Sequence, residues 1–516
     1  MTTGPIAAAA RIHDVIERAA RLRRDRPTLL DERYTLTGAT AEAAVRDTAA
    51  GLAADGVRPG DRLMLVGENS VAFAVLLLAA SRLGAWIVPV NARLTQSEIA
   101  LVRDHCRPRT MLFTVEASGD AAAHAAACGT RPLDAAYGGA IAMAPLADVA
   151  PEPLENDASS AVAALVFTTG TTGRPKGVML THANLLFVAQ LSAELRGVTA
   201  EDLVYGVIPL AHAFGLSSML LGSLCAGGAV KLAARFNPAA IAQALAEEGV
   251  TMLQGVPAMY ARLLELTAAQ GGRLPAPQLR YLQNGGAPLD PTLKARVEAA
   301  FGVPLHNGYG LTETSPTVAV TRRERPAADD SVGPIIPGVE AAFVDQLTGE
   351  VLAAGSVGEL RVRGPNVMKG YYRDPEATAA VLDADGWLRT GDLARLSAAG
   401  DLYIVGRLKE LIIRSGFNVH PPEVEAAIQT HPDVAIAAVV GRQVQGNEEI
   451  VAFVQPVAGR RLESMAVARH LEDRLAAYKR PQRWVILAEL PASPTGKILK
   501  AELRSRAARL DDDPTP

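Results

Sequence analysis

A ten-residue stretch rich in glycine and threonine has the residue types that bind phosphate groups. It runs from Thr168 to Gly177, between an apolar run over 161–167 and a second apolar run over 178–180. Such runs are typical of buried strands, so the stretch is expected to be a turn between two strands. Glycine lets backbone N–H groups converge, threonine adds hydroxyl donors, and lysine adds charge. The predicted binding residues are Thr168, Thr169, Gly170, Thr171, Thr172, Gly173 and Lys176.

This turn differs from a Walker A loop. Four residues separate Gly170 from Pro175, whereas a Walker A loop has Gly-Lys-Ser/Thr at that place. A surface hairpin without a ligand is the alternative interpretation. Because so many donors and a lysine lie together between apolar runs, the pattern favours a site for the β- and γ-phosphates of a nucleotide.

Two further loops follow predicted strands and carry candidate site residues. His212 comes directly after an apolar run over 204–210, where a hydrogen-bonded structural histidine is the alternative. Gly285, Gly286 and Ala287 offer flat backbone against which an aromatic ring can lie.

A third loop combines a phenol, a hydroxyl and a carboxylate. These groups belong to Tyr309, Thr312 and Glu313. A carboxylate beside phosphates indicates a Mg²⁺ ligand, and a solvated loop glutamate is the alternative.

Short apolar runs alternate with helical patterns in the first part of the chain. Strands are expected at 63–66, 86–90 and 110–114, with a helix at 71–83 and another after Thr95, which begins a capping box with Glu98. The stretch from Asp134 to Ser160 has the composition of a connecting loop. This alternation predicts an α/β fold with mostly parallel sheets flanked by helices and a ligand beyond the strands' carboxyl ends.

The pattern changes after about residue 339. Shorter strands and turns over about 339–405 predict a small β-rich module, with a hairpin that turns at Ala399-Gly400. A helix that starts at Pro421-Pro422 and strands at 434–440 and 450–454 then predict a separate α/β domain.

Composition excludes several classes of protein. The 516 residues are 49% hydrophobic and carry a net charge of −4, so several globular cores are expected and a basic surface for nucleic acid is not. Cys106, Cys128 and Cys225 have neither disulfide nor zinc spacing and are expected to be buried thiols. No apolar stretch is long enough for a membrane span or resembles a signal peptide, so a cytoplasmic location is expected.

With these stretches in order, the chain resembles the adenylate-forming superfamily, which includes acyl- and aryl-CoA synthetases, firefly luciferase and the adenylation domains of peptide synthetases. The resemblance covers nearly the whole chain and is specific because five motifs occur in the family's order. They are Thr168 to Gly177, Tyr309-Gly310-Leu311-Thr312-Glu313, Arg389-Thr390-Gly391-Asp392, Gly406-Arg407-Leu408-Lys409 and Pro494-Thr495-Gly496-Lys497.

The resemblance implies that a carboxylate attacks the α-phosphorus of ATP to form an acyl-adenylate, which a thiol then cleaves. The turn at 168–177 would hold the leaving pyrophosphate, Thr312 the α-phosphate and Glu313 the Mg²⁺ ion. Asp392 and Arg407 would contact the ribose. Gly285, Gly286, Ala287 and Tyr309 would line the adenine slot.

The resemblance also divides the chain into an N-terminal domain, 1–408, and a mobile C-terminal domain, 409–516, that rotates about Lys409. Lys497 matches the catalytic lysine of adenylation, whereas Lys500 is expected to be an ordinary surface lysine. In the second, thioester-forming state Ser415, Gly416 and Phe417 would flank the pantetheine arm of CoA, with His212 as the gate. The segment 441–450 is shorter than its family counterpart, so no contacts with the CoA nucleotide are carried over.

The acyl pocket is predicted to take an uncharged fatty or aromatic acid. Phe214, Val256 and Gly308 would line it, and no acid near His212 could bind an amino group. The resemblance therefore favours an AMP-forming acid:CoA ligase that uses ATP, Mg²⁺ and CoA. An acyl-AMP ligase that loads a carrier protein, a luciferase-like oxidation and a non-catalytic nucleotide-binding protein are the alternatives, and a homodimer stays open.

Overall fold

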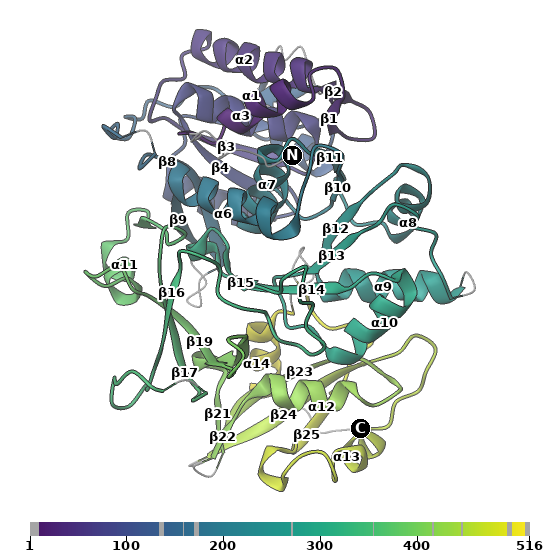
Figure 1. The fold of residues 1–516 in the computed structure, drawn as a ribbon. Coiled ribbons are helices and arrows are strands. Elements are labelled where there is room, and N and C mark those ends of the chain that lie inside the picture. Colours follow the sequence, from purple (N-terminus) through teal and green to yellow (C-terminus); the bar gives the residue numbers. More distant parts are fainter. Residues whose placement is uncertain are drawn as a thin grey trace.

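The computed structural model describes residues 10–133, 139–157, 159–169, 175–269, 272–353, 355–414, 417–444, 447–492 and 498–510. Within these ranges two large sheets, with helices between and outside them, build the N-terminal part of the molecule, and a smaller α/β domain lies beneath it in the view of Figure 1. The mixed α/β fold with a larger and a smaller domain confirms the predicted fold class.

The first sheet is parallel through its centre and antiparallel at both edges. Its order is β15 (Thr317–Val320), β14 (Leu305–Gly310), β13 (Tyr281–Asn284), β12 (Met252–Gly255), β10 (Leu203–Gly206), β11 (Ala229–Leu232), β1 (Pro27–Leu30) and β2 (Thr35–Thr37). The parallel strands point their carboxyl ends to one edge, where His212 and Gly285 lie in the following loops and Tyr309 lies near the end of β14.

The second sheet is also parallel in its central strands and antiparallel towards both edges. Its order is β18 (Gly370–Tyr371), β9 (Pro175–Thr181), β8 (Val162–Thr169), β4 (Trp86–Asn91), β3 (Arg62–Gly67), β5 (Thr110–Phe113), β7 (Ile141–Met143) and β6 (Arg131–Leu133). Strand β7 lies in the stretch that was expected to be only a connecting loop. Its Ile-Ala-Met sequence is too short for a periodic pattern, and pairing with β5 decides its conformation.

Helices cover both faces of each sheet. An apolar cluster between the sheets joins α1 (Asp14–Leu22), α2 (Gly38–Ala54), α3 (Val71–Leu83), α6 (His182–Arg196), the π-helical η1 (Phe214–Leu221) and α7 (Gly222–Cys225). The outer face of the first sheet carries α8 (Pro238–Glu247), α9 (Pro257–Ala269) and α10 (Pro291–Phe301), and that of the second carries α4 (Gln96–Cys106) and α5 (Gly119–Ala126). Layers on both faces explain why the central strands are continuous apolar runs rather than alternating ones.

Local sequence signals set several helix ends. Thr95 and Glu98 form the expected capping box at the start of α4. Thr181 accepts from the backbone N–H of Asn184 at the start of α6, and Gly197 ends that helix at φ +61°.

A small antiparallel sheet connects the large sheets to the C-terminal domain. It consists of β16 (Glu340–Val344), β17 (Gly358–Arg363), β19 (Leu388–Leu396) and β20 (Leu402–Arg407). The pairing of β19 with β20 confirms the predicted hairpin. Helix α11 (Pro375–Val381) lies between β18 and β19 in the chain.

The C-terminal domain has cores of its own on both faces of a three-stranded sheet. After the 3₁₀ turn η3 (Leu408–Glu410) come β21 (Ile412–Arg414), β22 (Phe417–Val419), α12 (Pro421–Gln429), β23 (Val434–Val444), β24 (Asn447–Pro456), α13 (Ser464–His470), η4 (Ala477–Lys479), β25 (Arg483–Ile486) and α14 (Lys500–Ala508).

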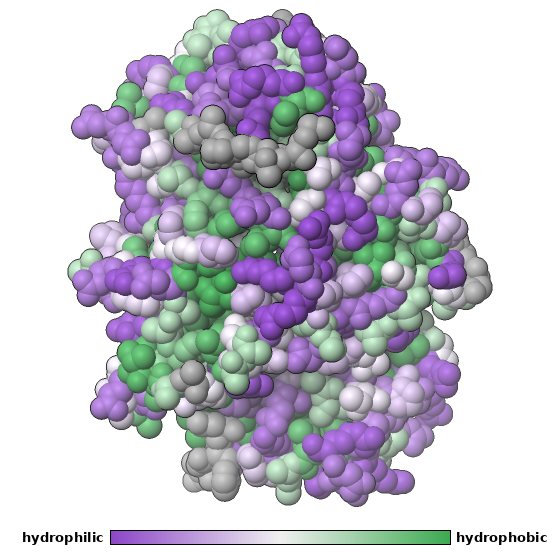
Figure 2. Space-filling model, viewed as in Figure 1, coloured by the Kyte–Doolittle hydropathy of each residue, from purple (hydrophilic) through white to green (hydrophobic). Residues whose placement is uncertain are grey.

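The thiols and the surface partly follow the sequence expectations. Cys106 and Cys225 are buried, but Cys128 is partly exposed. Across the described ranges, every helix is too short or too polar to cross a bilayer. Hydrophobic residues on the face in Figure 2 concentrate across the middle of the view, where Figure 1 places β15 and the small antiparallel sheet.

Candidate active site

The predicted anion-binding turn joins two antiparallel strands. In β8 and β9, Thr168 pairs with Lys176, and the backbone of Thr169 pairs with that of Pro175. This pairing confirms the two predicted strands and extends them into the stretch as far as Thr169 and from Pro175. The predicted ligands Gly170, Thr171, Thr172 and Gly173 lie outside the described residues.

Tyr371 connects this turn to the predicted Mg²⁺ ligand. Its phenol O–H donates to Glu313 Oε1 over 2.8 Å, and Lys176 Nζ lies 4.7 Å from the centre of its ring. Strand β18 places the ring there because Tyr371 pairs with Val178 of β9. Burial, followed by the Glu313 carboxylate, raises the pKa of the phenol, so it stays a donor at neutral pH.

Sequence reasoning missed Tyr371. Its neighbours in the chain carry no pattern of phosphate or metal ligands, and its partner Glu313 is 58 positions away. A carboxylate that accepts from a phenol while a lysine lies over the same ring is visible only after β9 and β18 have paired.

The Thr312-Glu313 pair lies in a tight turn that follows β14. This 3₁₀ turn, η2 (Thr312–Thr314), is held by a hydrogen bond from Leu311 N to Thr314 Oγ1 over 2.9 Å. The backbone N–H of Met368 donates to the carbonyl of Glu313 over 2.9 Å and so fixes the turn against the segment that leads to β18. The metal-ligand candidate is therefore placed by backbone bonds as well as by its side chain.

Tyr309 and Arg407 meet at the buried carboxylate of Asp392. The Tyr309 O–H donates to Asp392 Oδ2 over 2.6 Å, and Arg407 Nε lies 2.9 Å from Asp392 Oδ1. Asp392 and Arg407 are direct partners in the β19–β20 ladder, and the Asp392 residue is 1% exposed. Burial and this carboxylate raise the pKa of Tyr309. The structure thus brings together three residues that the sequence assigned to one nucleoside.

Phe214 lies beside the predicted glycine slot. A methyl group added to Gly285 would come within 3.1 Å of the Phe214 ring, and one added to Gly286, at φ +79°, within 3.9 Å of Val256. Ala287 accepts a hydrogen bond from Asn284 Nδ2 over 3.3 Å. The residues predicted for the adenine slot and for the acyl pocket therefore adjoin.

Gly308 provides a close approach to the neighbouring strand. A methyl group at this position would lie 3.1 Å from Gln283 Nε2 of β13. Gly308 is partly exposed although the residue before it is buried. The missing side chain lets the backbone of β14 lie close to the Gln283 side chain at the place predicted for the acyl group.

His212 lies in the turn between β10 and η1. Strand β10 ends at Gly206, earlier than predicted, and the backbone N–H of His212 donates to Pro209 O over 3.0 Å. Burial, followed by the charge of Arg93, lowers the pKa of the His212 imidazole to about 4. The ring is neutral at neutral pH and can act as a hydrogen-bond partner rather than as a cation.

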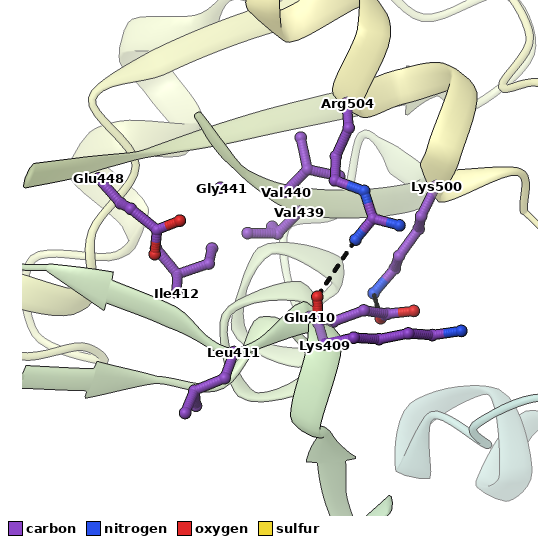
Figure 3. Close-up of a pocket in the computed structure, with 10 residues that line it drawn as sticks. All are labelled: Lys409, Glu410, Leu411, Ile412, Val439, Val440, Gly441, Glu448, Lys500 and Arg504. Carbon is purple, nitrogen blue, oxygen red and sulfur yellow. Dashed lines mark hydrogen bonds and ion pairs between the residues drawn. The ribbon is translucent and has the colours of Figure 1, made fainter. Parts of the chain in front are cut away.

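The hinge candidate Lys409 lies in η3, directly after the strand that carries Arg407. Burial, followed by the charge of Arg407, lowers the pKa of Lys409. Lys500, expected at the surface, instead has an 18% exposed side chain that is bonded to Glu410 (Figure 3) and also to Glu425. The expectation of an ordinary surface lysine is therefore wrong, because two carboxylates bind its ammonium group and little of the side chain is exposed.

Several predicted residues of the C-terminal domain cannot be placed. Lys497, Ser415 and Gly416 lie outside the described ranges. Of Phe417 only the backbone is described, and it pairs with Arg414 in the β21–β22 hairpin.

The donors and acceptors of the described site suit a nucleotide with a divalent ion. A carboxylate that already orders a phenol and a guanidinium is a rigid acceptor for sugar hydroxyls. Glu313 offers the oxygen ligand that Mg²⁺ prefers, and Lys176 offers a point charge for phosphate. The residues therefore fit the group that the motifs imply.

Comparisons with known proteins agree with this geometry. Residues 16–372 match the family model described as AMP-binding enzyme, and residues 423–497 match that of the AMP-binding enzyme C-terminal domain. The chain is 35% identical to 4-coumarate–CoA ligase 5 of Oryza sativa subsp. japonica, with 96% of this chain and 94% of the relative covered. It is 36% identical to a feruloyl-CoA synthase of Amycolatopsis sp, with 91% and 94% covered.

A solved structure has the same fold over nearly its whole length. The ATP-bound MatB of Rhodopseudomonas palustris superposes with a TM-score of 0.81 at 30% identity, with 95% of this chain and 98% of that chain covered. Motifs, buried cluster and comparisons point to the same chemistry. This chain belongs to the adenylate-forming AMP-binding enzymes and is an ATP-dependent, AMP-forming acid:CoA ligase.

Proposed function

We propose that this ligase activates an aromatic carboxylic acid. The observation that carries the proposal is the Phe214 ring, which lies against the backbone of Gly285. A flat ring can stack on Phe214 over glycine backbone, which gains energy from offset or edge contacts. The names of the two relatives, a coumarate ligase and a feruloyl-CoA synthase, support the same class of substrate.

In adenylation, different site residues would bind different parts of ATP. The turn at 168–177, with Lys176, would bind the phosphates that leave, and Thr312 the α-phosphate. Asp392 would accept from the ribose hydroxyls while Tyr309 and Arg407 hold its carboxylate in place. Mg²⁺, held by Glu313, would neutralise charge on the phosphates.

Lys497 would act in adenylation, and Lys409 would be the hinge for the change to thioester formation. Lys497 would contact the attacking carboxylate and the α-phosphate and offset their mutual repulsion. Rotation about Lys409, at the boundary between 1–408 and 409–516, would withdraw Lys497 and bring Ser415, Gly416 and Phe417 to the thiol of CoA. His212, neutral because it is buried, would gate the approach of that thiol. A cytoplasmic location suits these substrates.

A panel of acids tests the substrate class. Adenylation is measured as pyrophosphate release with 4-coumarate, ferulate, benzoate, octanoate and malonate, and the matched pair benzoate and cyclohexanecarboxylate isolates ring flatness. We expect aromatic acids to have at least tenfold higher kcat/KM than octanoate or malonate, and benzoate to exceed its puckered analogue. Octanoate or malonate as the best substrate would overturn the proposal.

The lysine roles have their own test. Lys497→Ala should abolish pyrophosphate release but spare thioester formation from supplied acyl-adenylate. Equal loss of both half-reactions would contradict the assigned role. Pyrophosphate release without any CoA thioester would instead support transfer to a carrier protein.

A further inference from the structure

Lys500 joins three segments of the C-terminal domain. It is the first residue of α14, and its Nζ lies 3.0 Å from Glu410 Oε2 (Figure 3) and 2.8 Å from Glu425 Oε1. Glu410 directly follows the hinge candidate Lys409 in η3, and Glu425 belongs to α12. One ammonium group thus ties the last helix to the hinge segment and to the domain core.

The three side chains depend on one another. Their exposed fractions are 18% for Lys500, 18% for Glu410 and 12% for Glu425, so water screens the charges poorly. The two carboxylates would repel each other without the ammonium between them. Glu425 also accepts from the backbone N–H of Val439 over 2.7 Å, which fixes the cluster to β23.

A second contact holds the hinge from the same face of the helix. Arg504 lies one turn after Lys500, and its Nη1 donates to the carbonyl of Lys409 over 3.5 Å. Figure 3 shows the Arg504 and Lys500 side chains reaching down from α14 to the hinge segment. Helix α14 therefore contacts the chain both at Lys409 and at the next residue, Glu410.

We propose that Lys500 is a positioning residue for adenylation, which fixes the segment that carries Lys497 to the hinge at Lys409. Lys497 lies three residues before Lys500, so the anchor at the start of α14 decides where that segment enters the active site. When the chain turns at Lys409, Glu410 turns with it, and the ion pair transmits this rotation to α14. The inference rests on the role proposed above for Lys497.

Lys500 is not a second catalytic lysine. Both neighbouring carboxylates occupy its ammonium group, and burial is outweighed by Glu425 and Glu410, which raise its pKa. Its part in the reaction is to hold another residue, so its loss should lower the turnover of one half-reaction without changing substrate affinity.

Two glutamine substitutions give the sharpest test. Glu410→Gln and Glu425→Gln each remove one carboxylate charge next to Lys500, but only Glu410→Gln removes the ion pair between Lys500 and the hinge segment. With 4-coumarate, or the panel acid with the highest rate, we expect Glu410→Gln to lower kcat for pyrophosphate release at least tenfold with KM for ATP within twofold. Glu425→Gln should stay within threefold of the parent protein.

The lysine itself is tested with matched variants. Lys500→Met should lower adenylation at least as much as Glu410→Gln, while thioester formation from supplied acyl-adenylate stays within threefold, and Lys500→Arg should recover part of the loss. Arg506→Met, on the same helix and paired with Glu502 at the surface, is the control. If Lys500→Met does not fold, the two glutamine variants decide the question.

The outcomes separate this inference from the role of Lys497. If Lys497→Ala abolishes adenylation while Glu410→Gln and Lys500→Met leave it intact, only this inference falls. Equal losses in both half-reactions, or equal effects of Glu410→Gln and Glu425→Gln, would also overturn it and indicate a purely structural cluster. If Lys497→Ala keeps adenylation, the role and the inference fall together.

Discussion

Replacing Tyr371 by phenylalanine should raise the Mg²⁺ requirement of the enzyme. The variant deletes the 2.8 Å hydrogen bond to Glu313 but keeps the ring under Lys176. A hydrogen bond to a charged group contributes about 1.5–3 kcal/mol. Since about 1.4 kcal/mol is tenfold in an equilibrium constant, Glu313 should hold the ion roughly 10- to 100-fold more weakly.

The assay is a Mg²⁺ titration of pyrophosphate release at fixed ATP. We expect the half-saturating Mg²⁺ concentration to rise by about one to two orders of magnitude. At saturating Mg²⁺ the rate should largely recover, because removal of the phenol oxygen alone leaves the other ATP contacts unchanged. Mn²⁺ binding to the protein with ATP, followed by electron paramagnetic resonance, gives a readout that does not depend on turnover.

The adjacent residue provides the matched control. Tyr372 donates its own O–H to Glu152, which is not one of the predicted site residues, so Tyr372→Phe also removes a phenol–carboxylate bond. An unchanged Mg²⁺ curve in Tyr371→Phe would refute the reasoning. An equal shift in Tyr372→Phe would show that the effect is general destabilisation.

Three further changes test other parts of the site and fold. Asp392→Asn should raise KM for ATP by roughly 10- to 100-fold in the pyrophosphate assay, since a buried carboxylate loses its charge; an unchanged KM would exclude it from the nucleoside site. Gly308→Val should shift the acid panel toward smaller acids at constant KM for ATP, because its Cβ would press on Gln283; an unchanged ranking would remove Gly308 from the pocket. Burial lowers the pKa of His182 to about 3 and of His306 to about 4, so below pH 6.5 the unfolded chain binds protons that the folded chain does not. The free energy of unfolding should therefore fall between pH 6.5 and 4, by about 1.4 kcal/mol per unit of pKa shift, and His306→Gln should flatten the dependence of the urea midpoint on pH.

Elements with strong local signals were predictable from the sequence. The strands around Thr168 to Gly177, the capping box at Thr95 and the end of α6 at Gly197 all depend on residues within a few positions. Local backbone preferences decide such features, so they can be read before the fold is known. The predicted extent of β10 was wrong, and so was the prediction that the stretch containing β7 is only a connecting loop. Tertiary pairing, not local pattern, sets both features.

The motifs also named Tyr309, Asp392 and Arg407 as one nucleoside site, and the structure brings these residues together. The roles of Tyr371 and Lys500 could not be read in the same way. Tyr371 depends on a glutamate 58 positions away and Lys500 on one 90 positions away.

The sequence by itself determined the strands, the turns and the order of the motifs, because each depends on neighbours along the chain. Only the tertiary structure decided which side chains hold the site residues in place. A phenol or a lysine has the same chemistry anywhere in a sequence, and the partners that give it a function are chosen by packing between distant segments.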